Sequence, residues 1–203
     1  TVRLDSATHT LLGDASLIDV SGLGDSSAGS VWLRSDQHTT FQGTLLARGG
    51  DAGGDGGFVD VSSAGQVELL GLVDASAPQG TLGALLIDPK NLEVNDTGGV
   101  VYANNTNNLF TSNPSSNTII TTSSIDSQIA DVTLQANNDI TVTSAINIAN
   151  ADTALTLRAG RSVLINNNVT TNNGAIAITA NDASANPAYR DAGTGAITMA
   201  SGT

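Results

Sequence analysis

The sequence predicts an all-β protein, a right-handed parallel β-helix (solenoid) with an irregular insertion. A short run of two or three apolar or β-branched residues in alternation, followed by a polar turn, recurs with first positions 2, 31, 59, 85, 132, 155, 176 and 197. The successive steps are 29, 28, 26, 47, 23, 21 and 21 residues. A period in the twenties built only from strands is typical of a solenoid. Each pass of the chain, called a rung here, buries its apolar edge only when the next rung stacks on it.

Composition supports the same fold class. Hydrophobic residues make up 39% of the chain but aromatic residues only 3%, so the core must consist of Val, Ile, Leu and Ala, which stack well in repeated strands. Twenty-two glycines, with many Asn, Ser, Thr and Asp, are the residues of turns between short strands. No segment carries a convincing period of 3.6. The chirality of parallel crossovers then predicts a right-handed winding.

Residues 1–94 form a first β-helix block with long rungs. Glycine-rich corners are predicted at 21–24 and 49–57, where glycine supplies the positive φ of a sharp turn. The strands are predicted at 2–4, 17–20, 31–33, 44–47, 58–61, 67–69, 72–75, 85–87 and 92–94.

Residues 95–130 break the period. They are rich in Asn, Thr and Ser around two small apolar islands, 100–102 and 118–120. The step of 47 exceeds a normal rung by roughly two dozen residues, a length typical of an insertion. We expect this insertion to leave the rod and make few core contacts.

Residues 131–203 form a second β-helix block with short rungs. Alternation places Val, Leu and Ile inward and Thr, Asn and Arg outward. Asparagines are expected at the corners, because Asn tolerates the left-handed region and bonds its own backbone. The strands are predicted at 132–134, 140–142, 146–148, 155–157, 163–165, 169 and 176–178.

Charge and cysteine content argue against nucleic-acid binding, binding to anionic membranes and thiol chemistry. Seven Lys and Arg against 19 Asp and Glu give a net charge of -12, with no basic cluster for nucleic acid or anionic membranes. The absence of Cys excludes disulfides and thiolate sites. No run of about 18 apolar residues is present. Because strand-forming residues stand at both ends, we expect the chain to be a segment of a longer protein.

One stretch carries a family resemblance. Residues 47–62 (ARGGDAGGDGGFVDVS), 71–77 (GLVDASA) and 85–92 (LLIDPKNL) resemble a block of the large filamentous-haemagglutinin-type exoproteins of Gram-negative bacteria. Residues 157–160 (LRAG) are similar to later repeats of that family. Asp60, where Glu is expected, and Ser63, where Gly is usual, depart from the pattern.

The resemblance implies a β-helical shaft of a secreted adhesin at the bacterial cell surface. It also implies a partner, the outer-membrane transporter of the two-partner secretion pathway, during export. No stretch resembles the N-terminal secretion motifs of that family, so we place the chain in the central shaft.

Two groups of residues suggest metal sites. Asp51 and Asp55 in the glycine-rich corner offer oxygen ligands of the kind that Ca²⁺ takes, although the nine-residue register of calcium-binding β-rolls is missing. His9 and His38 lie one rung apart and are predicted to stack on one face, either as a polar stripe or around a metal. For Asp51 and Asp55 the favoured interpretation is a flexible corner that binds no metal or other cofactor.

Few residues suggest ligand binding. Trp32 alternates with two inward residues, so it is predicted to face outward, where its ring could stack on a sugar. Tyr102 and Phe110 are the corresponding candidates in the insertion. An enzyme is not expected, since the carboxylates that catalysis would pair are scattered.

The leading functional hypothesis is therefore a structural shaft segment that displays a binding region away from the cell. The first alternative is a carbohydrate-binding or matrix-binding module that contacts a host or matrix glycan or protein. The second is a self-assembling extracellular filament subunit that associates through the ends of the β-helix, where strand edges are open.

Overall fold

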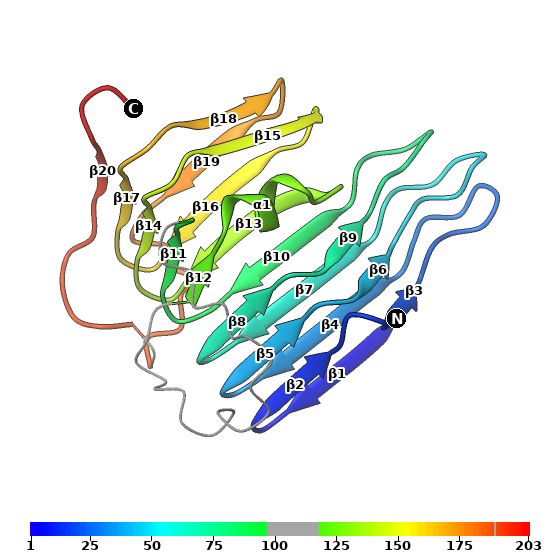
Figure 1. The fold of residues 1–203 in the computed structure, drawn as a ribbon, viewed down its shortest axis with the longest axis horizontal. Coiled ribbons are helices and arrows are strands. Elements are labelled where there is room, and N and C mark those ends of the chain that lie inside the picture. The colour runs from blue at the N-terminus through cyan, green and yellow to red at the C-terminus, as the bar shows by residue number, and fades with distance from the viewer. Residues whose placement is uncertain (97–117, 189) are drawn as a thin grey trace.

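The computed structural model describes residues 1–96, 118–188 and 190–203 (Figure 1). It is 48% strand and 3% helical, and its named strands pair in parallel, so the all-β prediction is confirmed. The chain passes repeatedly along three sides. The first strand of each pass joins a seven-stranded main sheet, and the following strands join smaller sheets on a second and a third side.

The main sheet confirms the predicted repeat. Its strands, in spatial order, are β1 (Val2–Ser6), β4 (Ser30–Ser35), β7 (Phe58–Ser63), β10 (Ala84–Asp88), β13 (Asp131–Ala136), β16 (Leu155–Ala159) and β19 (Ile176–Thr179). Seven of the eight predicted first positions are register partners in one column: Val2, Val31, Val59, Leu85, Val132, Leu155 and Ile176. The step of 47 therefore separates two strands that are neighbours in this sheet.

The second and third sides hold shorter strands. On the second side lie β2 (His9–Leu12), β5 (His38–Phe41) and β8 (Gln66–Leu69), then β12 (Thr118–Ile120), β11 (Leu92–Val94), β14 (Ile140–Val142), β17 (Val163–Ile165) and β20 (Ile197–Met199). On the third side lie β3 (Leu17–Asp19), β6 (Thr44–Leu46) and β9 (Leu72–Asp74), and further along β15 (Ile146–Ala151) and β18 (Val169–Asn172). Sequence reasoning missed β2 and β5, whose threonines obscure the alternation.

The eighth predicted recurrence, at Ile197, does not belong to the main sheet. Ile197 pairs with Val163 on the second side and not with Ile176 of the main sheet. The chain leaves β19 through the long connection 180–196 and next forms a strand only at β20. A three-residue alternation fits either side, so the pattern alone could not decide between them.

The core is a column of aliphatic side chains between the three sides. Val31, Leu33, Val59 and Leu85 have no exposed surface, as their inward assignment requires. The outermost strands are less covered: Leu4 is 39% exposed on β1, and Ile176 is 42% exposed on β19. Both ends of the stack thus present apolar side chains that only a further layer would bury.

The prediction that the insertion makes few core contacts is wrong for residues 118–130, which pair with the first block and contribute to its core. Residues 97–117 of the predicted insertion lie outside the described residues. β12 pairs with β11, and the Val67 N–H donates to the Thr118 hydroxyl at 3.0 Å, so β12 lies between β8 and β11. Ile120 and Ile125 are buried in the core. The second side therefore holds one strand more than the main sheet here, an excess of about 4.8 Å.

A short helix, α1 (Thr122–Asp126), completes this junction on the third side (Figure 1). Gln128 follows it with no exposed surface. Its side-chain oxygen accepts from the Val73 N–H at 2.7 Å, and its amide nitrogen donates to the Gly71 carbonyl at 3.1 Å. The next rung provides no regular strand to pair with β9 here. The Gln128 side chain instead bonds the Val73 N–H of β9 and the carbonyl of Gly71, which directly precedes β9. The helix is too short to show a helical period in the sequence.

The predicted positive φ is found at one glycine of each glycine-rich corner, Gly24 with a φ of 61° and Gly54. Between residues 49 and 57 only Gly54 has a positive φ, of 90°. At Gly50 a Cβ would lie 2.3 Å from the Gly24 carbonyl oxygen of the preceding rung. Close approach of stacked backbones, more than turn conformation, excludes side chains here.

The column of inward residues predicts a sharp contrast between neighbours. Val132→Asp should lower the free energy of unfolding by about 4 kcal/mol or more, because it buries an unpaired charge. Thr133→Asp, on the outward face of the same strand, is the control and should cost far less. Urea unfolding measures both, and equal costs would mean that the assignment of faces is wrong.

The junction predicts a second effect. Gln128→Leu keeps the volume but leaves the Val73 N–H and the Gly71 carbonyl without partners. It should cost about 2–4 kcal/mol, since each buried unsatisfied group costs about 1–3 kcal/mol. Gln37→Leu, at an exposed corner, is the matched control and should stay within about 0.5 kcal/mol in the same urea assay.

Candidate functional site

A groove of about 710 Å³ crosses the outer face of the main sheet. It runs from β1 to β13 and is closed on one flank by residues of the connection 180–196, Ser184 and Asn186. Most of its lining is polar, and six of the sixteen lining residues are charged. These six are Arg3, Asp5, Arg34, Asp36, Asp60 and Asp88.

An ion pair between adjacent rungs organises the centre of the groove. The Arg34 Nε donates to Asp60 Oδ2 at 3.0 Å, and its terminal nitrogen contacts the same oxygen. Asp60 is only 1% exposed, and the Ser62 hydroxyl donates to its other oxygen. Arg34 pairs in register with Ser62, so Asp60, 26 positions after Arg34, lies two residues before the register position on the neighbouring strand. The period of the sequence could have placed the two residues on adjacent strands.

Asp88 is the unusual carboxyl of the groove. Its Oδ1 is buried with no hydrogen-bond partner, while Gln135 Nε2 donates to its Oδ2 at 3.3 Å. Burial, and then the negative charge of Asp60, raise the pKa of Asp88 to about 6. Arg34 and Arg158 offset this only in part. Near neutral pH this groove therefore holds one carboxyl that takes up a proton readily.

Trp32 lies where the sequence predicted it, on the outer face between inward Val31 and Leu33. It is half-buried and stands between Arg3 and Asp60 in register. Its ring packs against Phe58 with centroids 6.2 Å apart and planes tilted by 57°. The aromatic pair borders the charged groove. The other two candidates, Tyr102 and Phe110, lie outside the described residues.

The two predicted calcium ligands, Asp51 and Asp55, lie in the glycine-rich corner, and Asp55 bonds the backbone of the next corner. Asp55 Oδ1 accepts from the Thr81 N–H of the next corner at 2.8 Å, and that hydrogen bond lowers the pKa of Asp55. Asp51 is exposed in the preceding turn. No group of three or more His, Cys, Asp or Glu side chains suited to a metal occurs within residues 1–96, 118–188 and 190–203.

The two histidines do stack, as their spacing predicts. His9 and His38 are register partners of β2 and β5, with ring centroids 6.1 Å apart. Burial lowers the pKa of His38, and the neighbouring His9 contributes in the same direction. The neutral imidazole is therefore favoured at His38, which suits a stacked pair on the second side.

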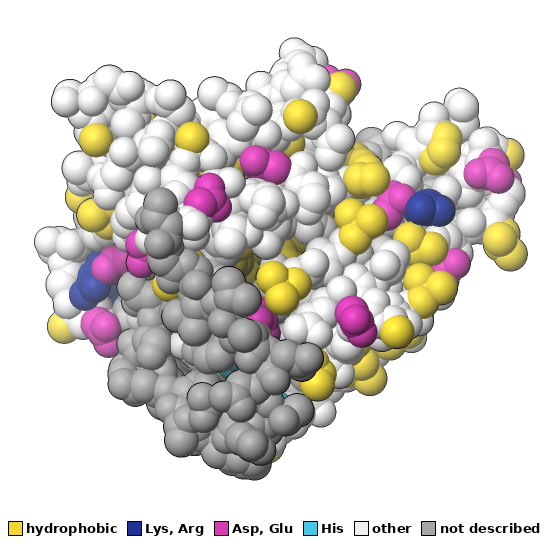
Figure 2. Space-filling model, in the orientation of Figure 1, with side chains coloured by type: hydrophobic (Ala, Val, Ile, Leu, Met, Phe, Trp, Pro, Cys, Tyr) yellow, Lys and Arg dark blue, Asp and Glu magenta, His cyan; other side chains and the backbone are white. Residues whose placement is uncertain are grey.

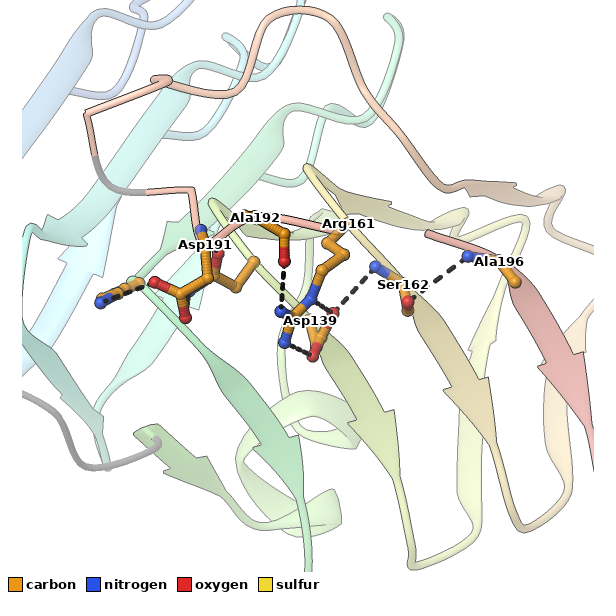
Figure 3. A network of polar contacts seen from close by, with 8 residues as sticks. Asp139, Arg161, Ser162, Asp191, Ala192 and Ala196 are labelled. Atoms are coloured by element: carbon orange, nitrogen blue, oxygen red, sulfur yellow. Dashed lines mark hydrogen bonds and ion pairs between the residues drawn. The ribbon is translucent and has the colours of Figure 1, made fainter. Parts of the chain in front are cut away.

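A second polar cluster lies at the corner between the main sheet and the second side (Figure 3). Arg161 Nε donates to Asp139 Oδ1 at 2.9 Å, and the Ser162 N–H donates to the same oxygen at 2.9 Å. The hydrogen bond from Arg161 is the main cause that lowers the pKa of Asp139. Asp191, from the connection 180–196, lies beside this pair (Figure 3).

Asp191 ties that connection to two successive corners. Its Oδ2 accepts from Asn138 Nδ2 at 3.0 Å, and its N–H donates to Asn138 Oδ1 at 2.6 Å. Its Oδ1 lies 3.5 Å from the Lys90 Nζ. Sequence reasoning missed this cluster, since the rung period does not relate residue 191 to the other two.

Figure 2 shows carboxylates spread over the visible face with few cations beside them, and hydrophobic side chains gathered over β3, β6 and β9. The exposed leucines of the third side are Leu17 and Leu72. Among the described residues, no helix is long and apolar enough to cross a membrane.

Comparison with protein-family models, with curated proteins and with solved structures finds no match to this chain.

The environment of Asp88 predicts a pH-dependent effect. The folded state holds the proton up to about pH 6 and the unfolded state only to about pH 3.8, so wild-type stability falls as the pH rises through this window. Asp88→Asn removes the charge and should raise the free energy of unfolding above pH 6, by at most about 3 kcal/mol. Below about pH 4 the variant should match the wild type. An equal difference at pH 4 and pH 7.5 in urea melts would contradict this.

Proposed function

We propose that the stacked sheets form a right-handed parallel β-helix and that the chain is a shaft segment of a secreted bacterial surface adhesin. The resemblance of residues 47–92 to filamentous-haemagglutinin-type exoproteins motivates the family and the two-partner route of export. The observation that carries the structural role is the single column of register partners from Val2 to Ile176. Such a column builds length along one axis.

The outer ion pairs favour the same role. Arginines bond carboxylates of a neighbouring rung in Arg34–Asp60, Arg48–Asp74, Arg158–Asp182 and Arg161–Asp139. Each of these four carboxylates has its own arginine partner, and the four pairs lie at separate places along the stack. Each pair joins successive rungs, which is what a shaft under load requires.

A carbohydrate-binding module is the second candidate, and the groove is the observation that favours it. A half-buried aromatic residue, Trp32, stands in register between Arg3 and Asp60, which line the groove together with donors and acceptors such as Arg34, Asp88 and Gln135. Aromatic stacking and planar polar groups together suit a sugar ring. Because carboxylates outnumber arginines in the groove, a neutral glycan fits it better than an acidic one.

One experiment separates the two. Bacteria displaying the whole chain on an outer-membrane anchor, with a module of known ligand fused at the distal end, should adhere under flow only to surfaces that carry this ligand. Cells displaying the chain alone should not adhere to glycan or matrix surfaces.

Adhesion by the chain alone would contradict a purely structural role. If Trp32→Ala and Arg34→Ala abolished that adhesion, and Arg48→Ala, which breaks the comparable Arg48–Asp74 pair outside the groove, did not, the groove would be the binding site.

A further inference from the structure

The one lysine of the sequence occupies a chemically special position. Lys90 follows Pro89 at the corner after β10, and Asn138 stands at the corresponding corner after β13, one rung on. The Asn138 N–H donates to the Lys90 carbonyl at 3.0 Å, so the two side chains start from adjacent backbone positions. Asn138 has no exposed surface, and the Lys90 side chain is about three-quarters buried, being 26% exposed.

A single carboxylate contacts the functional groups of both. Asp191 Oδ1 lies 3.5 Å from Lys90 Nζ, and Asp191 Oδ2 accepts from Asn138 Nδ2 at 3.0 Å. The Asp191 N–H donates at 2.6 Å to Asn138 Oδ1. An amine, an amide, a carboxylate and an N–H aimed at the amide oxygen therefore meet at one corner.

We propose that this corner is a modification site, at which Lys90 and Asn138 form an intramolecular isopeptide cross-link with Asp191 as the catalytic acid and base. This inference does not rest on the proposed function. The carboxylate takes a proton from the Lys90 ammonium, and the freed Nζ attacks the Asn138 Cγ. The new bond is Nζ–Cγ, and the negative charge that develops on Oδ1 is stabilised by the Asp191 N–H.

The second half of the reaction releases ammonia. The Cγ–Nδ2 bond breaks as Asp191 returns its proton to Nδ2, and the proton lost by Nζ leaves with the product. The balance is one ammonium and one primary amide giving one secondary amide and one ammonium ion. No oxidant, metal or cofactor is needed. The fold supplies the rate by holding the groups together, an effect worth many orders of magnitude in well-oriented intramolecular reactions.

The cross-link would close the chain around the junction. Residues 91–137 contain β11, β12, α1 and β13, and they would become a covalently closed loop between two neighbouring corners of the main sheet. A bridge of this kind restricts the unfolded chain as a disulfide does. The sequence has no Cys, so an amide is the covalent bridge available to it.

Mass spectrometry of the purified full chain tests this. The folded protein should be lighter than its sequence by one ammonia. A protease that cleaves before Asp should release 88–95 and 131–138 as one joined species, and trypsin should fail to cut after Lys90. Lys90→Arg keeps the positive charge but removes the nucleophile. Asp191→Asn, on a half-exposed side chain, removes the acid and base. Both variants should show the full mass and the wild-type circular dichroism.

Three results would overturn the proposal. A folded wild type of full mass would mean that the contacts are an ordinary ion pair and hydrogen bonds. Loss of ammonia with peptides 88–95 and 131–138 separate would indicate a succinimide at Asn138. Loss of water with Lys90 joined to Asp191 would show that Lys90 attacks the Asp191 carboxyl group and not the Asn138 side chain. Each readout uses the wild-type protein, so it holds even if a variant fails to fold.

Discussion

The parallel register of the main sheet is the constraint on which the rest of this structure depends. Strand side chains alternate with a period of two, so a slip of one residue would move every inward aliphatic side chain to the solvent face. Seven strands keep one register from Val2 to Ile176, and this places Leu33, Val61 and Leu134 in a second inward column. The outward positions are stacked by the same geometry. Arg34 meets Asp60 only because their strands pair in that register.

The junction between the blocks shows how a stack tolerates an interruption. A strand edge exposes N–H and carbonyl groups that must find partners when they are buried. Thr118 and Gln128 supply such partners from side chains, for β8 and β9 respectively. Asp96 accepts from the Thr122 N–H at 2.8 Å and so fixes the start of α1. The extra strand on the second side accompanies the divergence of the two blocks seen in Figure 1.

Much of the surface chemistry lies on the main sheet and at its carboxyl edge. The groove and the Arg34–Asp60 pair lie on the outer face of the sheet, and the corner of Lys90, Asn138 and Asp191 follows the carboxyl ends of β10 and β13. The connection 180–196 brings Ser184 and Asp191 back across this edge, although they follow the last main-sheet strand in sequence. If the chain is the proposed shaft segment and carries the proposed cross-link, the ion pairs and this bridge would together resist force at the place where the regular strand pairing is interrupted.

The sequence by itself determined what depends on local alternation and on the period. It predicted the first positions of seven main-sheet strands, the inward aliphatic residues, the outward Trp32 and the stacked His9 and His38, because strand periodicity and rung spacing are written in consecutive residues. Tertiary structure decided the rest. Which strand β12 or β20 pairs with depends on the path of the connecting chain and on hydrogen bonds between distant backbones. The meeting of Lys90, Asn138 and Asp191 follows from that path, and no spacing in the sequence encodes it.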